Sequence, residues 1–186
     1  MKNIDYYIKQ AENMKSTSDG GSPAYHFDDV CLIKYISQIK YGQARKNAEQ
    51  VAKIANEKNA KGVRTPVHLE FKRVIDGEIE ICWVLQEKAK GRNFGYYCEN
   101  EDSKVQLDMQ SRLANAPDAH YEKLVSDFCE LFNLGLELKP KNMFYNEDIQ
   151  DGGFTIIDLL GGTGEPLNPD SLRDILKIYP QLRCYI

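Results

Sequence analysis

The residues with the clearest chemical potential lie in the run 136–142, which reads Leu-Glu-Leu-Lys-Pro-Lys-Asn, and at Asp158, sixteen residues after Asn142. Amide and carboxylate oxygens such as those of Asn142 and Asp158 bind magnesium, commonly together with phosphate oxygens of a substrate. Glu137 stands five residues before Asn142 and offers a carboxylate that could accept the proton of a hydroxyl group. Phosphoryl transfer requires a protein to supply magnesium ligands and a carboxylate beside the acceptor hydroxyl.

A β-hairpin is expected to bring Asn142 and Asp158 together. The segments 142–145 and 154–157 are rich in aromatic and β-branched residues, which favour strands. The residues Asn-Glu-Asp at 146–148 and Gly-Gly at 152–153 lie between them and favour a turn. The outer ends of such a hairpin carry Asn142 and Asp158. The same residues also fit a plainer interpretation, in which Asn142 makes a turn and Asp158 caps a strand end.

These segments resemble the catalytic motifs of protein kinases. The run 137–142 is similar to the kinase pattern Asp-Leu-Lys-Pro-x-Asn, and Ile-Ile-Asp-Leu-Leu at 156–160 is similar to the region of the Asp-Phe-Gly motif. The resemblance implies Glu137 as the catalytic base and Lys139 as the catalytic-loop lysine. It also implies Asn142 and Asp158 as metal ligands, with ATP and Mg²⁺ as cofactors.

A strand and a helix upstream fit the same resemblance. Val-Cys-Leu-Ile-Lys at 30–34 resembles the kinase strand Val-Ala-Ile-Lys, which implies that Lys34 contacts phosphate oxygens. The following segment has one apolar helical face, formed by Ala44, Ala48, Val51, Ala52 and Ala55. Glu49 lies beside that face, fifteen residues after Lys34, and is expected to form an ion pair with it. Glu57, further along the helix, is a less favoured partner, and all these charges also fit a solvated surface.

Two further strands and a connecting segment complete the first half. The segments 67–74 and 80–85 read as strands, and Asp76-Gly77 between them is a strong hairpin signal. The segment 86–91 that follows resembles the kinase hinge, where backbone groups bind the adenine edge, so Gln86 and Lys88 are assigned to the cofactor site. A helix with a buried apolar stripe is expected after Pro117.

The order of these elements predicts the fold class. We expect an α+β, two-lobed protein-kinase-like fold, with an antiparallel N-terminal sheet plus one helix and a reduced helical C-terminal lobe. A single domain is expected over 1–186, with the N-terminal lobe at 1–88 and the C-terminal lobe at 89–186. Only one helix, at about 168–178, is expected after Asp158.

Several departures from the kinase pattern leave the function open. The glycine-rich loop is reduced to Gly20-Gly21, Pro23 removes a backbone donor there, and Glu137 stands where kinases have Asp. The chain is therefore expected to be a divergent phosphotransferase that acts on an unidentified hydroxyl acceptor. The alternative is a catalytically inactive, pseudokinase-like binding or regulatory module. A third reading is a small interaction domain with an accidental motif.

Composition limits the partners. The formal net charge is −4 and the isoelectric point is about 5.5, which disfavours a nucleic-acid-binding surface. No apolar stretch is long enough to span a bilayer, and the N-terminal residues lack the apolar segment of a signal peptide, so a cytoplasmic protein is expected. The five cysteines lack zinc-site spacing. The expected partners are a nucleotide and a protein partner or acceptor, with the oligomeric state left open.

Overall fold

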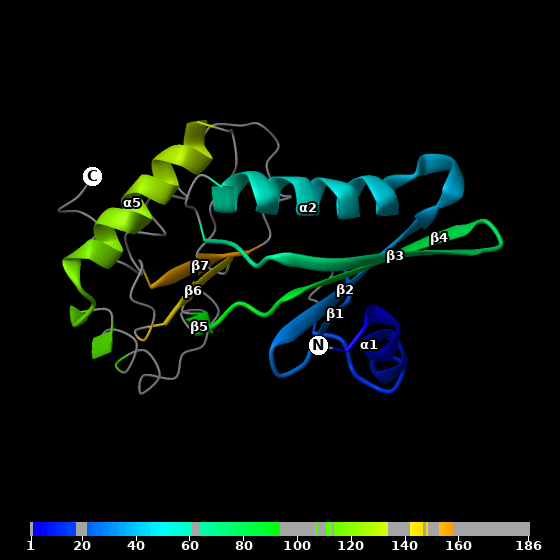
Figure 1. Cartoon of the computed structure of the whole chain (residues 1–186), viewed down its shortest axis with the longest axis horizontal. Coiled ribbons are helices and arrows are strands. Elements are labelled where there is room, and N and C mark those ends of the chain that lie inside the picture. The colour runs from blue at the N-terminus through cyan, green and yellow to red at the C-terminus, as the bar shows by residue number, and fades with distance from the viewer. Residues whose placement is uncertain are drawn as a thin grey trace. The chain divides into compact units, whose positions relative to one another are not determined.

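The computed structural model of the chain describes residues 2–17, 22–60, 64–93, 107, 111–112, 114–133, 142–146, 148 and 153–157. The chain divides into two compact units. Unit 1 comprises Met1–Asn59 and Pro66–Lys88, and unit 2 comprises Ala60–Thr65 and Ala89–Ile186. Figure 1 labels their helices and strands. Within the described ranges, no helix is both long and apolar enough to cross a membrane.

Unit 1 is built on a four-stranded antiparallel sheet with the order β1-β2-β4-β3. The strands are β1 (Ala24–His26), β2 (Val30–Gln38), β3 (His68–Asp76) and β4 (Ile79–Glu87). The predicted hairpin between β3 and β4 is confirmed. Gly77 takes a φ of 56° in its turn, a left-handed conformation that glycine adopts without a steric penalty.

One face of this sheet is covered by α1 (Ile4–Ala11), a short helix that the sequence analysis did not predict. Side chains alternate between the two faces of a strand, so Leu32 and its neighbours at even positions of β2 share one face. The hydrophobic core on that face consists of Ile4, Ala11, Val30, Leu32, Trp83 and Leu85. The Asn3 side chain caps α1 by accepting a hydrogen bond from the Tyr6 backbone N–H.

The opposite face is covered by α2 (Gln43–Ala60), as Figure 1 shows. A single turn of 3₁₀ helix, η1 (Ile39–Tyr41), connects β2 to α2. The predicted helix and its small apolar face are confirmed, because Ala44, Ala48 and Ala55 are all buried. The backbone N–H of Ala44 donates to Oγ of Ser37 at 2.9 Å, which fixes the start of α2 to the odd-numbered face of β2.

Unit 2 contains a three-stranded antiparallel sheet with the order β5-β6-β7 and the helix α5 (Asp118–Asn133). Its strands are β5 (Arg92–Asn93), β6 (Met143–Tyr145) and β7 (Phe154–Ile156). Buried side chains of α5 and of this sheet form the core, among them Tyr121, Leu124, Met143, Tyr145, Phe154 and Ile156. The predicted α+β fold class is therefore confirmed, and so is the helix predicted after Pro117.

Candidate functional site

The predicted hairpin of the candidate metal site is present in unit 2. Strands β6 and β7 pair antiparallel, with Met143 opposite Ile156 and Tyr145 opposite Phe154. The backbone N–H of Ile157 donates to the carbonyl oxygen of Asn142 at 2.8 Å, one step beyond the last strand pair. Asn142 therefore lies across from the residue that immediately precedes Asp158 in the chain. Asn142 is also buried, with 8% of its surface exposed.

The other three residues of the predicted catalytic set lie outside the described residues. These are Glu137, Lys139 and Asp158, and the expected helix at 168–178 falls there too. Among the side chains that the structure describes, no group of three His, Cys, Asp or Glu residues could hold a metal ion. The magnesium ligands and the catalytic base therefore stay predictions.

A buried polar pair supports the hairpin from α5. Nδ1 of His120 lies 3.1 Å from the hydroxyl oxygen of Tyr145, and both side chains are buried. Gly153 packs directly beside them with a φ of +64°, where a Cβ atom would lie 2.6 Å from both His120 and Tyr145. Only glycine fits this position. Nothing in the sequence pattern indicated a role for His120, because it lies far from the hairpin along the chain.

A buried carboxylate on α5, that of Asp127, lies within the electrostatic influence of Arg64, whose backbone is bonded to β7. The backbone N–H of Ile156 donates to the carbonyl oxygen of Arg64 at 3.0 Å. The positive charge of Arg64 also acts on Asp127, which is buried and forms an ion pair with Lys123 one helical turn earlier. Burial raises the pKa of Asp127, and Lys123 and Arg64 oppose that rise.

The expected ion pair between Lys34 and Glu49 is not formed, and this expectation is corrected. Lys34 pairs with Trp83 in the sheet, and its ammonium lies 5.0 Å from the centroid of the Trp83 ring. Trp83 belongs to the core beneath α1, whereas Glu49 is on α2, which covers the other face. Glu49 instead faces Arg45 at 3.8 Å, and 64% of its side chain is exposed.

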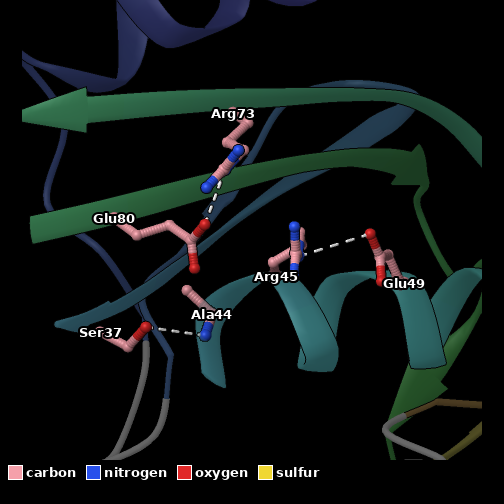
Figure 2. A network of polar contacts seen from close by, with 6 residues as sticks. All are labelled: Ser37, Ala44, Arg45, Glu49, Arg73 and Glu80. Carbon is pink, nitrogen blue, oxygen red and sulfur yellow. Dashed lines mark hydrogen bonds and ion pairs between the residues drawn. The ribbon is translucent and has the colours of Figure 1, made fainter. Parts of the chain in front are cut away.

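The face beneath α2 holds a different charged pair, which the sequence analysis did not predict. Nε of Arg73 lies 2.6 Å from Oε1 of Glu80, and the Glu80 side chain is only 1% exposed (Figure 2). The second oxygen of Glu80, Oε2, has no hydrogen-bond partner among the described residues. The neighbouring thiol of Cys82 is buried, and burial followed by the Glu80 charge raises its pKa. This cluster is a structural feature of the sheet and contains no reactive nucleophile.

The contact between Ser37 and α2 gives a modest prediction. Ser37→Ala is expected to lower the free energy of unfolding by about 1 kcal/mol, because the hydroxyl oxygen accepts a hydrogen bond from the first turn of the helix. Urea unfolding followed by circular dichroism measures the change. Ser37→Thr keeps the hydroxyl and should unfold at nearly the wild-type urea concentration. Equal losses for the two variants would show that the hydrogen bond is not responsible.

Gln86 and Lys88, the two residues assigned to the hinge, form their hydrogen bonds and strand pairs within unit 1. Gln86 belongs to β4 and pairs with Cys31 on one side and His68 on the other. The backbone N–H of Lys88 donates to the carbonyl oxygen of Asp29 at 3.0 Å. The Lys88 ammonium donates to the carbonyl oxygen of Phe27 at 2.9 Å. Adenine recognition through the Lys88 N–H would require its bond to Asp29 to break.

Comparison with known proteins supports the fold. No family model matches the sequence, and no curated protein matches it. Among solved structures, a crystal structure of WbdD matches with a TM-score of 0.51 and 13% identity, over 90% of this chain and 36% of that one. A structure of the bifunctional kinase-methyltransferase WbdD matches with a TM-score of 0.50 and 13% identity, over 87% of this chain and 34% of that one.

The chain thus spans about a third of the length of the WbdD chains that it matches. Similarity at this level of identity describes the fold and not the chemistry. Together with the antiparallel sheet, α2 and the hairpin of unit 2, it shows that this chain has a reduced, kinase-like α+β fold.

Proposed function

We propose that this chain is a divergent kinase-like phosphotransferase, which binds Mg-ATP and transfers the γ-phosphoryl group to a hydroxyl acceptor. The observation that carries the proposal is the hydrogen bond from the Ile157 N–H to the Asn142 carbonyl. This hydrogen bond brings the backbone of Asn142 opposite Ile157, the residue before Asp158. Two magnesium ligands on one hairpin would have to lie close together, and this register favours such an arrangement. The kinase-like fold supports the proposal, and WbdD, one of the proteins with a similar fold, is described as a kinase-methyltransferase.

The proposed site assigns each residue a separate task. Asn142 and Asp158 would supply oxygen ligands to magnesium, which would also bind phosphate oxygens of ATP. Burial of Asn142 limits the conformations of its side chain before the metal arrives. Glu137 would accept the proton of the acceptor hydroxyl. Lys139 would neutralise charge on the phosphoryl group during its transfer.

A second candidate function is a nucleotide-binding or regulatory module without catalysis. The position of Lys34 favours it, because the ammonium lies over Trp83 and has no Glu49 beside it to direct it toward phosphate. An active enzyme of this design would rely on magnesium and Lys139 for most of its charge stabilisation. Glu137, at the position where kinases have Asp, also favours the module without catalysis. Displacement of a catalytic group by ~1 Å can lower the rate roughly a hundredfold.

The two functions are separated by single-turnover transfer of labelled γ-phosphate from ATP, to the protein itself and to a panel of hydroxyl acceptors, with and without magnesium. Magnesium-dependent transfer supports the phosphotransferase. ATP binding without transfer to any acceptor supports the inactive module. A protein that binds no ATP under either condition contradicts both functions.

A further inference from the structure

A groove in unit 1 is lined by none of the residues assigned to the proposed site. It is bounded by α1 with the preceding Lys2, and by the turn between β1 and β2. Its volume is about 660 Å³, within the range of sites that hold small molecules. The residues that matter for its chemistry are Tyr6, Tyr7, Phe27, Asp28 and Asp29.

The turn that forms one wall of the groove is held in place by several contacts. The N–H of Phe27 donates to the carbonyl oxygen of Val30 at 2.9 Å, and Phe27 and Asp29 both accept hydrogen bonds from Lys88 through their carbonyl oxygens. The Phe27 ring packs edge-on against Tyr7 of α1, with the ring centroids 4.9 Å apart. The aromatic wall is therefore formed before any ligand arrives.

A cation already occupies part of this wall. The ammonium of Lys2 lies 3.8 Å from the centroid of the Tyr6 ring, which is the geometry of a cation–π interaction. The Tyr6 ring in turn packs edge-on against Tyr7, at a centroid separation of 5.3 Å. Lys2 precedes α1 and belongs to no strand, so its side chain can leave the ring without disturbing the sheet.

The groove also carries two carboxylates, those of Asp28 and Asp29, near the positive charges of Lys2 and Lys88. Asp28 and Asp29 are exposed, and within the described part of the chain their carboxylates form no ion pair. The Lys88 ammonium is already bound to the Phe27 carbonyl. Burial, followed by the charge of Lys88, lowers the pKa of His26 below its usual value of 6.5, so His26 is mostly uncharged at pH 7.

We propose that this groove binds an organic cation, an alkylammonium or alkylguanidinium group, which takes the place of Lys2 over Tyr6 and is held by Asp28 and Asp29. Aromatic faces and carboxylates are the two features that recognise such groups. Lys2 then acts as an internal competitor for the site. The proposal does not depend on phosphotransfer, because it uses none of the residues assigned to the magnesium hairpin.

The test is calorimetric titration of the full chain at pH 7 with agmatine, and separately with an uncharged-ended tripeptide that contains one arginine. Lys2→Gln is expected to tighten binding about two- to fivefold, because it removes the competing cation. The double change Asp28→Asn with Asp29→Asn is expected to weaken binding about five- to tenfold, since each exposed ion pair contributes modestly. Tyr6→Leu should weaken binding as well.

The matched control is Asp76→Asn with Glu78→Gln, which makes the same change of charge at exposed positions beside the turn between β3 and β4. This control should bind as the wild type does. Equal affinity for agmatine and the tripeptide would assign the site to small cations, and tighter binding of the tripeptide would assign it to basic polypeptide segments. Absence of saturable binding, weaker binding by Lys2→Gln, or an effect of the control as large as that of the Asp28 and Asp29 change would overturn the proposal.

Discussion

Glu137→Gln is expected to lower the rate of phosphoryl transfer by about 10²- to 10⁴-fold while leaving ATP affinity nearly intact. The amide is nearly the same size as the carboxylate but cannot accept the acceptor proton. Glu137 has one more rotatable bond than the Asp found at this position in kinases, so under the proposed function it would reach the hydroxyl from a less fixed position. Single-turnover kinetics with saturating Mg-ATP measure the chemical step directly.

Two further variants give this prediction its controls. Glu137→Asp keeps the carboxylate and is expected to lose much less activity than Glu137→Gln. Glu122→Gln makes the same chemical change at an exposed position of α5 and should transfer phosphate at the wild-type rate. If Glu137→Gln and the wild type transferred at equal rates, Glu137 would not be the base.

Arg73→Met is expected to lower the free energy of unfolding by about 3 kcal/mol. The Glu80 carboxylate is almost fully buried, and Arg73 is its only described partner. Removing one member of a buried pair leaves an unpaired charge in a low-dielectric site, which costs roughly 3–5 kcal/mol. We expect the low end because the Arg73 side chain is 38% exposed and water already solvates part of it. Urea unfolding of the full chain measures the loss.

The double variant Arg73→Met with Glu80→Met tests the reason for that loss. Replacing both members of a buried pair by apolar residues is often nearly neutral, so the double variant should recover most of the lost stability. Arg45→Met removes the partner of Glu49 on the surface of α2 and should cost less than about 1 kcal/mol. A double variant as unstable as Arg73→Met would show that Arg73 acts through packing and not through charge.

The parts of the fold that the sequence predicted are those specified by local patterns. Asp76-Gly77 between two runs of β-forming residues predicted the hairpin of β3 and β4, and glycine at position 77 fits its left-handed turn. The spacing of small apolar residues from Ala44 to Ala55 predicted α2 and its buried face. The hairpin of β6 and β7 followed from the same kind of pattern, and its register places Asn142 across from Ile157.

The features that the sequence did not predict depend on contacts between distant segments. Helix α1 has only eight residues, too few for a reliable periodicity, and gains its stability by packing on Trp83 and Leu85. The sequence also could not show which helix covers which face of the sheet. For that reason Lys34 was expected to meet Glu49, although alternation along β2 directs it to the face covered by α1. Arg73 and the buried Glu80 likewise resemble two solvated charges in the sequence, because the burial of Glu80 depends on assembly of the sheet and α2.

The most direct test of the proposed magnesium–nucleotide site is the affinity for ATP, measured by calorimetry with and without magnesium, in the wild type, Asp158→Ala and Asp148→Ala. Asp148 is an exposed aspartate in the connection between β6 and β7, so its variant is a matched control. We expect magnesium to tighten ATP binding about tenfold or more in the wild type and in Asp148→Ala, and to have almost no effect in Asp158→Ala. Undiminished magnesium dependence in Asp158→Ala would remove Asp158 from the metal site and contradict the proposed hairpin site.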